Sequence, residues 1–124
     1  MIGNMYWQTE KIVRYTHLNS AGTLFGGKAM SWIDEQSAIY AGKQMGTGRL
    51  VTAKISEIIF NAPVVNGDII AIGVDLVRVG RTSVTVQCQI KNISTDKVVV
   101  DVAELVFVAL DAEGKPTQHK LSKK

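Results

Sequence analysis

The segment from His17 to Glu35 carries most of the residues whose types and spacing could do chemistry. Gly26 and Gly27 open a run without proline, which predicts a helix that begins at this glycine pair. The first N–H groups of a helix lack partners within it, and the helix dipole favours negative charge there. Because glycine lets a ligand approach the backbone, the pair could stabilise an oxyanion. The alternative is that these glycines only permit a tight loop or close helix packing.

A carboxylate, Asp34, lies further along the same predicted helix. Its neighbours one turn away are apolar or small, so the side chain is expected on a buried face. An isolated buried carboxylate needs a partner or a raised pKa, which makes Asp34 a candidate base or nucleophile. The alternative is that Asp34 faces solvent beside Glu35, which is the better candidate for a solvated carboxylate.

The spacing of these groups indicates that one chain alone cannot bring them together. Gly27 and Asp34 are seven residues apart, or about 10 Å along a helix. An oxyanion held at the helix start is therefore out of reach of Asp34 in the same chain. Antiparallel pairing of two helices across a two-fold axis would place Asp34 of one near Gly27 and Asn19 of the other.

Hydrophobic periodicity predicts the elements that must position these residues. A first strand is expected over 5–16, a loop over 17–25, and a helix from 26 to about 45. This helix is apolar around most of its circumference, which is typical of a buried helix. Four further strands are expected over 49–60, 69–78, 82–93 and 97–110, with a bulge near Glu57. Short turns between strands predict an antiparallel sheet and an α+β, two-layer fold, in which the sheet wraps the helix or a second subunit covers it.

Composition sets the class of protein. The 124 residues fit a single domain over 1–124, with a core at about 5–110 and a basic tail at 111–124. One cysteine and two histidines exclude a disulfide framework and predict no metal site. The tail carries four lysines against two acidic residues, so it holds +2 of the net charge of +3. It is expected to be a solvated end, or an electrostatic aid for a small polyanion.

Other partners are not expected from the sequence. No apolar run approaches the length of a membrane span, and the first residues lack the features of a signal peptide. These features predict a cytoplasmic protein without a membrane partner. Basic residues form no stripe interleaved with aromatic residues, so nucleic-acid binding is not predicted.

Four motifs in order along the chain carry a family resemblance. They are Asn19-x-x-Gly22-x-x-Phe25-Gly26-Gly27 followed by Met30–Glu35, then Gly48–Thr52, then Phe60-x-x-Pro63-Val64-x-x-Gly67-Asp68, then Val79–Val84. Together they resemble the hotdog-fold acyl-CoA thioesterases, in the acyl-CoA hydrolase branch, over about residues 15–110. The resemblance implies the hotdog fold, a long central helix wrapped by a five-stranded antiparallel sheet.

The resemblance also implies roles for individual residues. Asp34 corresponds to the catalytic carboxylate, as general base or nucleophile. Asn19 corresponds to the asparagine of the facing subunit that positions water or the thioester. The backbone of Gly26 and Gly27 corresponds to the oxyanion site.

A second group of residues corresponds to the coenzyme A site. By resemblance, Arg81, Thr82 and Ser83 run along the pantetheine and phosphates of coenzyme A. Arg49 and Lys54 either reach phosphate oxygens or are ordinary surface charges.

The function implied is hydrolysis of acyl-CoA thioesters to a free acid and coenzyme A, in fatty acid metabolism. No cofactor is expected beyond the coenzyme A of the substrate. The minimal unit is expected to be a homodimer within a tetramer or hexamer. The alternatives are a non-catalytic acyl-CoA binding module and an enoyl-CoA hydratase-type hotdog enzyme, which would need a histidine that the helix lacks. His17 is interpreted as a loop histidine, and His119 as a tail residue without a role.

Overall fold

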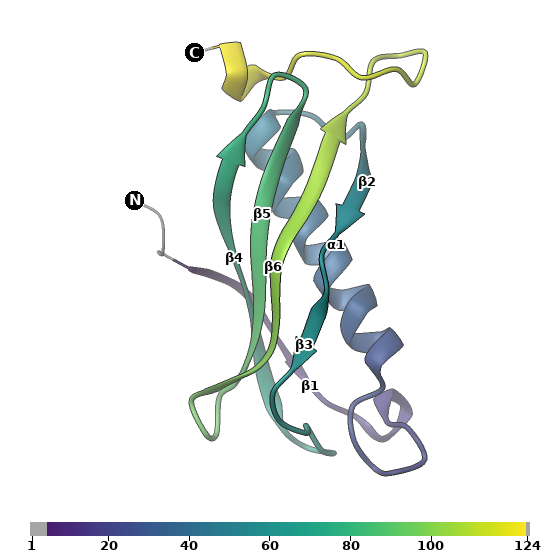
Figure 1. Cartoon of the computed structure of the whole chain (residues 1–124). Helices are drawn as coiled ribbons and strands as arrows, with labels where there is room; N and C mark the ends of the chain where they lie inside the picture. Colours follow the sequence, from purple (N-terminus) through teal and green to yellow (C-terminus); the bar gives the residue numbers. More distant parts are fainter. Residues whose placement is uncertain (1–4, 124) are drawn as a thin grey trace.

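The computed structural model describes residues 5–123 of the chain. Its elements run from one end of the sequence to the other with short connections (Figure 1). They are β1 (Tyr6–Ile12), the 3₁₀ helix η1 (Tyr15–His17), α1 (Gly26–Met45), β2 (Leu50–Ile55), β3 (Ile58–Phe60), β4 (Ile69–Val79), β5 (Ser83–Asn92), β6 (Lys97–Ala109) and the 3₁₀ helix η2 (Lys120–Lys123). The helix therefore has the bounds that the sequence predicts.

The strands form one antiparallel sheet in the order β1-β4-β5-β6-β2, and β3 also pairs with β6. The sheet has six strands rather than five because the strand expected over 49–60 is interrupted between β2 and β3. At the interruption, the hydroxyl of Ser56 accepts the N–H of Glu104 at 3.1 Å. A side-chain oxygen thus replaces a backbone acceptor near Glu57, where the bulge is predicted.

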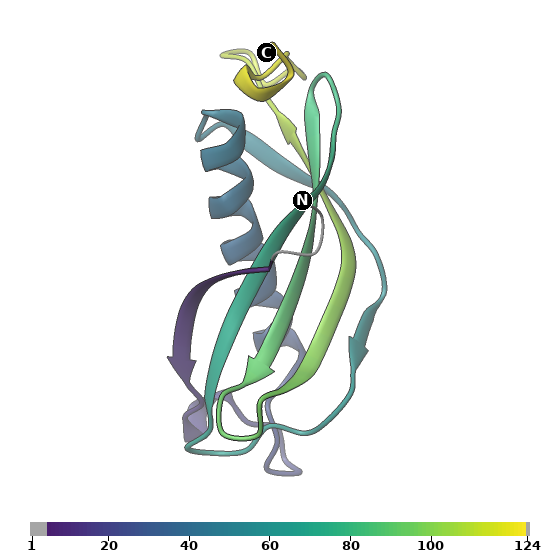
Figure 2. The ribbon, with the colours of Figure 1, turned by 90° about the vertical axis from the view of Figure 1, so that its left-hand side faces the viewer.

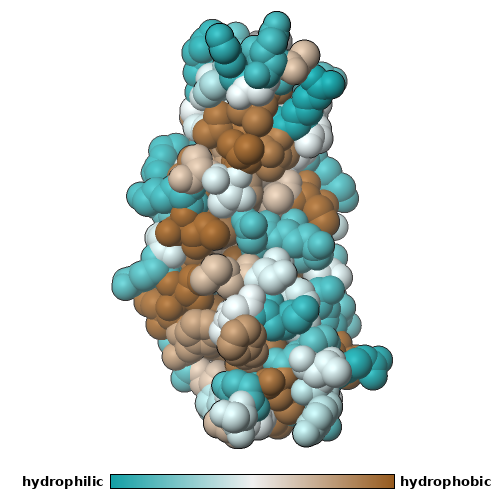
Figure 3. Space-filling model, turned by 90° about the vertical axis from the view of Figure 1, so that its right-hand side faces the viewer, coloured by the Kyte–Doolittle hydropathy of each residue, from teal (hydrophilic) through white to brown (hydrophobic). Residues whose placement is uncertain are grey.

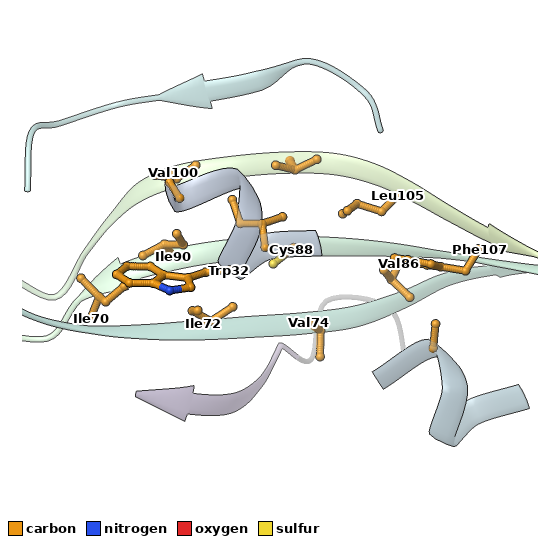
Figure 4. Close-up of a cluster of buried hydrophobic side chains, with 14 of the residues drawn as sticks. Trp32, Ile70, Ile72, Val74, Val86, Cys88, Ile90, Val100, Leu105 and Phe107 are labelled. Atoms are coloured by element: carbon orange, nitrogen blue, oxygen red, sulfur yellow. The ribbon is translucent and has the colours of Figure 1, made fainter. Parts of the chain in front are cut away.

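Helix α1 lies against one face of the curved sheet (Figure 2). Side chains from α1 and from the central strands form a continuous buried cluster between the two layers (Figure 4). Trp32 of the helix lies beside Ile70 and Ile90 of the sheet (Figure 4). The same cluster includes Ile33, Val86 and Phe107. The α+β, two-layer prediction is therefore confirmed.

The sheet does not cover all of the apolar surface. Met30 and Ile39 of α1 remain 45% and 42% exposed, and Phe60 of β3 remains 52% exposed. Figure 3 views the molecule from the side of β2, and hydrophobic side chains gather there in several patches along its length. Strand β2 ends the sheet order on this side, so a second chain could cover it.

Two expectations were wrong in detail. The first strand ends at Ile12, because Val13 turns inward, is fully buried and donates its N–H to the carbonyl of Asp68 at 2.8 Å. The tail is not simply a solvated end, because His119 is 3% exposed and Leu121 packs against the core. Within residues 5–123, no helix combines the length and apolar character needed to cross a bilayer.

Candidate active site

Asp34 lies in the middle of α1, on the side that faces β2. Its Oδ1 atom accepts a hydrogen bond of 2.8 Å from the hydroxyl of Thr52 on β2. Asp34 is half-buried and Glu35 is exposed, so Asp34 lies between the two alternatives, less solvated than Glu35 but not on a fully buried face. The partner expected for Asp34 is therefore Thr52. Thr52 ends the Gly48–Thr52 motif, but nothing in its residue type or spacing predicts this contact.

The start of α1 has open backbone donors. Phe25 precedes the helix in an extended conformation, and its carbonyl accepts the N–H groups of Lys28 and Ala29 at 3.0 and 3.1 Å. Within residues 5–123, the N–H groups of Gly26 and Gly27 have no hydrogen-bond partner. Such donors at a helix start favour an anion or a polarised carbonyl oxygen.

The two glycines differ in the space that a side chain would have at each position. A Cβ atom at Gly27 would lie 2.6 Å from Cε2 of Phe25, so the ring of Phe25 packs directly on this residue. A Cβ atom at Gly26 would lie 3.5 Å from the ring of Phe60, an ordinary contact. Close packing therefore requires a glycine at position 27. The N–H groups of both glycines nevertheless remain open.

A pocket of 440 Å³ lies beside the helix start, and Asn19, Gly26 and Phe60 line it together. The side-chain oxygen of Asn19 accepts the N–H groups of Ala21 and Thr23 at 3.0 and 3.1 Å. Its amide donates one hydrogen bond to the Thr23 hydroxyl at 3.0 Å. A carboxamide has two N–H donors, so Asn19 shapes the loop and keeps one donor for a ligand.

The structure separates this pocket from the carboxylate. Asp34 is not among the residues that line the pocket, and it follows Gly26 by eight residues of helix, about 12 Å. One chain therefore holds two groups of functional residues, which we call the donor site (Asn19, Gly26 and Gly27) and the carboxylate site (Asp34 and Thr52).

The residues expected to bind coenzyme A lie at the end of the sheet where Thr52 of the carboxylate site also lies. Arg81 and Thr82 form the turn between β4 and β5, and Ser83 is the first residue of β5. Thr52 pairs with Phe107, which pairs in turn with Val84. Thr52 is thus level with this turn, two strands away in the sheet.

Arg49 and Lys54 have different surroundings. Arg49 is exposed, and its carbonyl accepts the N–H of Leu110 at 2.9 Å at the same end of the sheet. Lys54 forms an ion pair of 3.7 Å with Glu104, which Arg78 also contacts at 3.3 Å. A phosphate would compete with Glu104 for Lys54.

His17 contacts neighbouring residues through its ring. The ring of His17 packs edge-on against Trp32, with a centroid separation of 4.9 Å, and its Nδ1 accepts the N–H of Arg14 at 3.0 Å. Loss of hydration, followed by the charges of Lys28, Arg14 and Lys11, lowers the pKa of His17. The loop interpretation of His17 fits these contacts. No group of residues within 5–123 has the composition of a metal site.

Comparisons with known proteins give the family. The family model of the thioesterase superfamily matches residues 21–99. Acyl-CoA thioester hydrolase YciA of Escherichia coli K12 is 34% identical over 104 residues, covering 79% of this chain and 78% of YciA. An uncharacterized acyl-CoA thioester hydrolase of Buchnera aphidicola subsp. Schizaphis graminum is 34% identical over 106 residues, covering 81% of this chain and 78% of that protein.

Comparison with solved structures gives the same family. An acyl-CoA hydrolase from Staphylococcus aureus, in complex with butyryl coenzyme A, coenzyme A and coenzyme A disulfide, has a TM-score of 0.81 and 34% identity. That match covers 90% of this chain and 66% of the other. A hexameric hotdog-fold thioesterase of Campylobacter jejuni has a TM-score of 0.78 and 27% identity, covering 90% of this chain and 88% of the other. The chain has the hotdog fold and belongs to the thioesterase superfamily.

Proposed function

We propose that this protein hydrolyses acyl-CoA thioesters to a free carboxylic acid and coenzyme A. The observation that carries the proposal is the carboxylate of Asp34, half-buried and oriented by Thr52. The open N–H groups at the start of α1 supply the second requirement of acyl transfer, donors for a developing oxyanion.

Variants of the Staphylococcus aureus enzyme support the choice of residues. An asparagine, an aspartate and a threonine of that enzyme have each been replaced by alanine in solved structures. The asparagine and aspartate are 15 residues apart there, as are Asn19 and Asp34 here. The threonine follows the aspartate by 17 residues there, and Thr52 follows Asp34 by 18 here.

In the proposed reaction, the thioester carbonyl oxygen accepts hydrogen bonds from the N–H groups of Gly26 and Gly27. Asn19 orients the carbonyl or the water through its remaining amide donor. As the carbonyl carbon is attacked, negative charge gathers on the oxygen, and the N–H groups and helix dipole stabilise it. Removing one such donor typically costs about 10²–10³ in rate.

Asp34 acts either as a base or as a nucleophile. As a base it takes a proton from water, the hydroxide oxygen bonds to the carbonyl carbon, and the C–S bond then breaks as the thiolate recovers that proton. As a nucleophile its oxygen bonds to the carbon, the thiolate leaves, and water hydrolyses the mixed anhydride. Neither route requires a metal or redox cofactor. Single turnover in ¹⁸O-labelled water distinguishes them, because only the nucleophilic route can leave the label in Asp34.

The proposed site is completed by two chains. The donor site of one protomer meets the carboxylate site of its partner in a homodimer, which the free edge of β2 and the exposed apolar residues of α1 favour. The dimer is proposed as the unit of a larger assembly, since the Campylobacter jejuni relative is hexameric. Coenzyme A is proposed to contact Arg81, Thr82 and Ser83, with Arg49 and Lys54 near its phosphates.

The activity is tested with acyl-CoAs from short to long chain length, by following release of the free thiol. We expect Asp34→Asn to lower kcat by about 10²–10⁴, the usual contribution of a general base. The matched control is Glu35→Gln, which changes the neighbouring exposed carboxylate and should keep full activity. Undiminished turnover by Asp34→Asn eliminates its role. Tight binding of acyl-CoA without turnover would identify a binding module, and hydration of an enoyl-CoA would identify a hydratase.

The two-chain site is tested by mixing two inactive variants. Asn19→Ala and Asp34→Asn each damage every site in their own homodimers. In a re-equilibrated equal mixture, half of the dimers are mixed, and each mixed dimer has one intact site, so about one quarter of the wild-type activity should return. No recovery, in a mixture shown to exchange subunits, contradicts a site shared between chains.

A further inference from the structure

Three carbonyl oxygens of the turn proposed to bind coenzyme A accept hydrogen bonds from the protein, namely those of Arg81, Thr82 and Ser83. The carbonyl of Thr82 accepts the N–H of Ala109 at 2.8 Å. The carbonyl of Ser83 accepts the N–H of Gly80 at 2.8 Å. The carbonyl of Arg81 lies 2.9 Å from the hydroxyl of Ser122. The tail therefore contacts this turn through Ser122.

His119 is the centre of that contact. It is 3% exposed, and its Nε2 lies 2.9 Å from the Ser83 carbonyl oxygen. Its Nδ1 accepts the N–H of Ser122 at 3.3 Å, so Nε2 must carry the ring proton and donate it to Ser83. Its backbone N–H also points to the Arg81 carbonyl, at 3.4 Å. Nε2 thereby holds the turn at Ser83, and Nδ1 holds Ser122 of the tail in place.

The direction of these carbonyls fixes what the turn offers to a ligand. In a trans peptide, the C=O and the following N–H point in opposite directions. Because the tail holds the Arg81 carbonyl, the N–H of Thr82 points away from the tail. Arg81 is exposed, and within residues 5–123 it forms no ion pair. An incoming phosphate can therefore meet the N–H of Thr82 and the guanidinium of Arg81, while the carbonyl oxygens of Arg81, Thr82 and Ser83 are held by the protein.

The tail also reaches the end of the helix. A Cβ atom at Gly46, the residue that caps α1, would lie 2.7 Å from Cδ of Lys120. Figure 1 shows the tail, in yellow, lying across the same end of the molecule as the β4–β5 turn. The tail thus joins the β4–β5 turn to the end of the helix that carries Asp34.

We propose that His119 and Ser122 are positioning residues, which hold the Arg81–Ser83 turn in the conformation that binds the phosphate-bearing part of coenzyme A. This inference rests on the proposed thioesterase function and adds the tail to its binding machinery. The family match ends at residue 99, so the tail lies outside the matched segment.

The test compares two substrates that differ only at the nucleotide end, an acyl-CoA and the same acyl group on N-acetylcysteamine. We expect His119→Ala to raise KM for the acyl-CoA about tenfold, the effect of losing one part-buried hydrogen bond. Ser122→Ala should raise it about threefold, because the bond from its hydroxyl to Arg81 is exposed. Their kcat, and their kcat/KM for the truncated substrate, should stay near wild type. His119→Gln retains an N–H donor of similar reach to Ser83 and should restore much of the affinity.

Gln118→Ala is the matched control, because within residues 5–123 the Gln118 side chain has no hydrogen bond. It should leave both substrates unaffected. If His119→Ala does not fold, Ser122→Ala decides, since it removes only one hydroxyl. Equal losses on both substrates, or an unchanged KM for acyl-CoA, would overturn the positioning role and leave the thioesterase proposal intact. A wild-type protein that hydrolyses neither substrate would overturn both.

Discussion

At the scale of single residues, the Thr52 hydroxyl sets the orientation of the proposed catalytic carboxylate through one 2.8 Å hydrogen bond. Thr52→Val keeps the shape of the side chain and removes the donor. We expect kcat to fall at least tenfold, because Asp34 loses the bond that orients it. Thr52→Ser retains the hydroxyl and should keep most of the activity. Steady-state kinetics on one acyl-CoA would measure both, and equal activity of the valine and serine variants would count against this role.

The buried thiol of Cys88 should make the stability of the protein depend on pH. Burial raises the pKa of this thiol from 9.0 to about 11. The folded state therefore retains this proton at pH values where the unfolded chain has lost it. Stability from this group is present below pH 9 and is lost as the pH rises toward 11, by up to about 1.4 kcal/mol per pH unit.

Urea unfolding at several alkaline pH values measures this loss. The free energy of unfolding should fall more steeply with pH for the wild type than for Cys88→Ala, which lacks the thiol. Parallel curves for the two proteins would show that the thiol does not contribute.

Some of these residues can be predicted from the sequence and others cannot. Asp34 and the glycine pair can be predicted because both belong to one helix, whose spacing is fixed locally. Thr52 cannot, because the pairing with Asp34 depends on how β2 approaches α1. His119 cannot, because a lone histidine in a polar tail has no pattern that predicts its burial.

At the scale of elements, the end of α1 depends on Gly46, which adopts a φ of 73° and contacts the stem of Lys120. Gly46→Ala should destabilise the protein by more than about 1 kcal/mol, because alanine is strained in this conformation and its Cβ displaces the lysine. Gly48→Ala is the control, because its added Cβ meets no atom within 4 Å and its φ is not positive. Urea unfolding compares the two, and equal stabilities would contradict this account of the helix end.

The elements also show what periodicity can predict. The helix bounds were predicted because glycine signals mark both ends. The interruption between β2 and β3 was anticipated only as a bulge, because it depends on Ser56 meeting Glu104 across the sheet. The first strand was predicted too long, because its β-forming residues continue past the point where Val13 turns into the core.

At the scale of the whole molecule, the exposed side of α1 should be an interface between chains. Ile39 is 42% exposed and lines a groove of 670 Å³ with Gly42 and Leu50. Ile39→Glu places a charge there and should shift the protein toward monomers and lower its activity, because a buried charge is costly. Sedimentation velocity measures the shift.

The comparison variant is Ile93→Glu, at a residue that is also 42% exposed but lies in the turn between β5 and β6. It should assemble like the wild type. If both variants assemble equally well, the groove beside α1 is not the interface between chains.

The overall fold was the most predictable level, because the strand pattern and one long apolar helix permit few arrangements. How the chains meet was less predictable. The free edge of β2 and the apolar helix indicate that a second chain binds. The orientation of that chain depends on surface shape, which hydrophobic periodicity does not predict.

The separation of the donor and carboxylate sites, about 12 Å along α1, has a consequence for the life of the protein. With the two-chain site proposed above, a newly synthesised chain would carry only halves of the reacting groups and would leave thioesters intact until it met a second chain. Under strong dilution, turnover would fall with the square of the protomer concentration, as mass action requires. Synthesis level and hydrolytic capacity would then be related non-linearly, and chains at low abundance would remain idle.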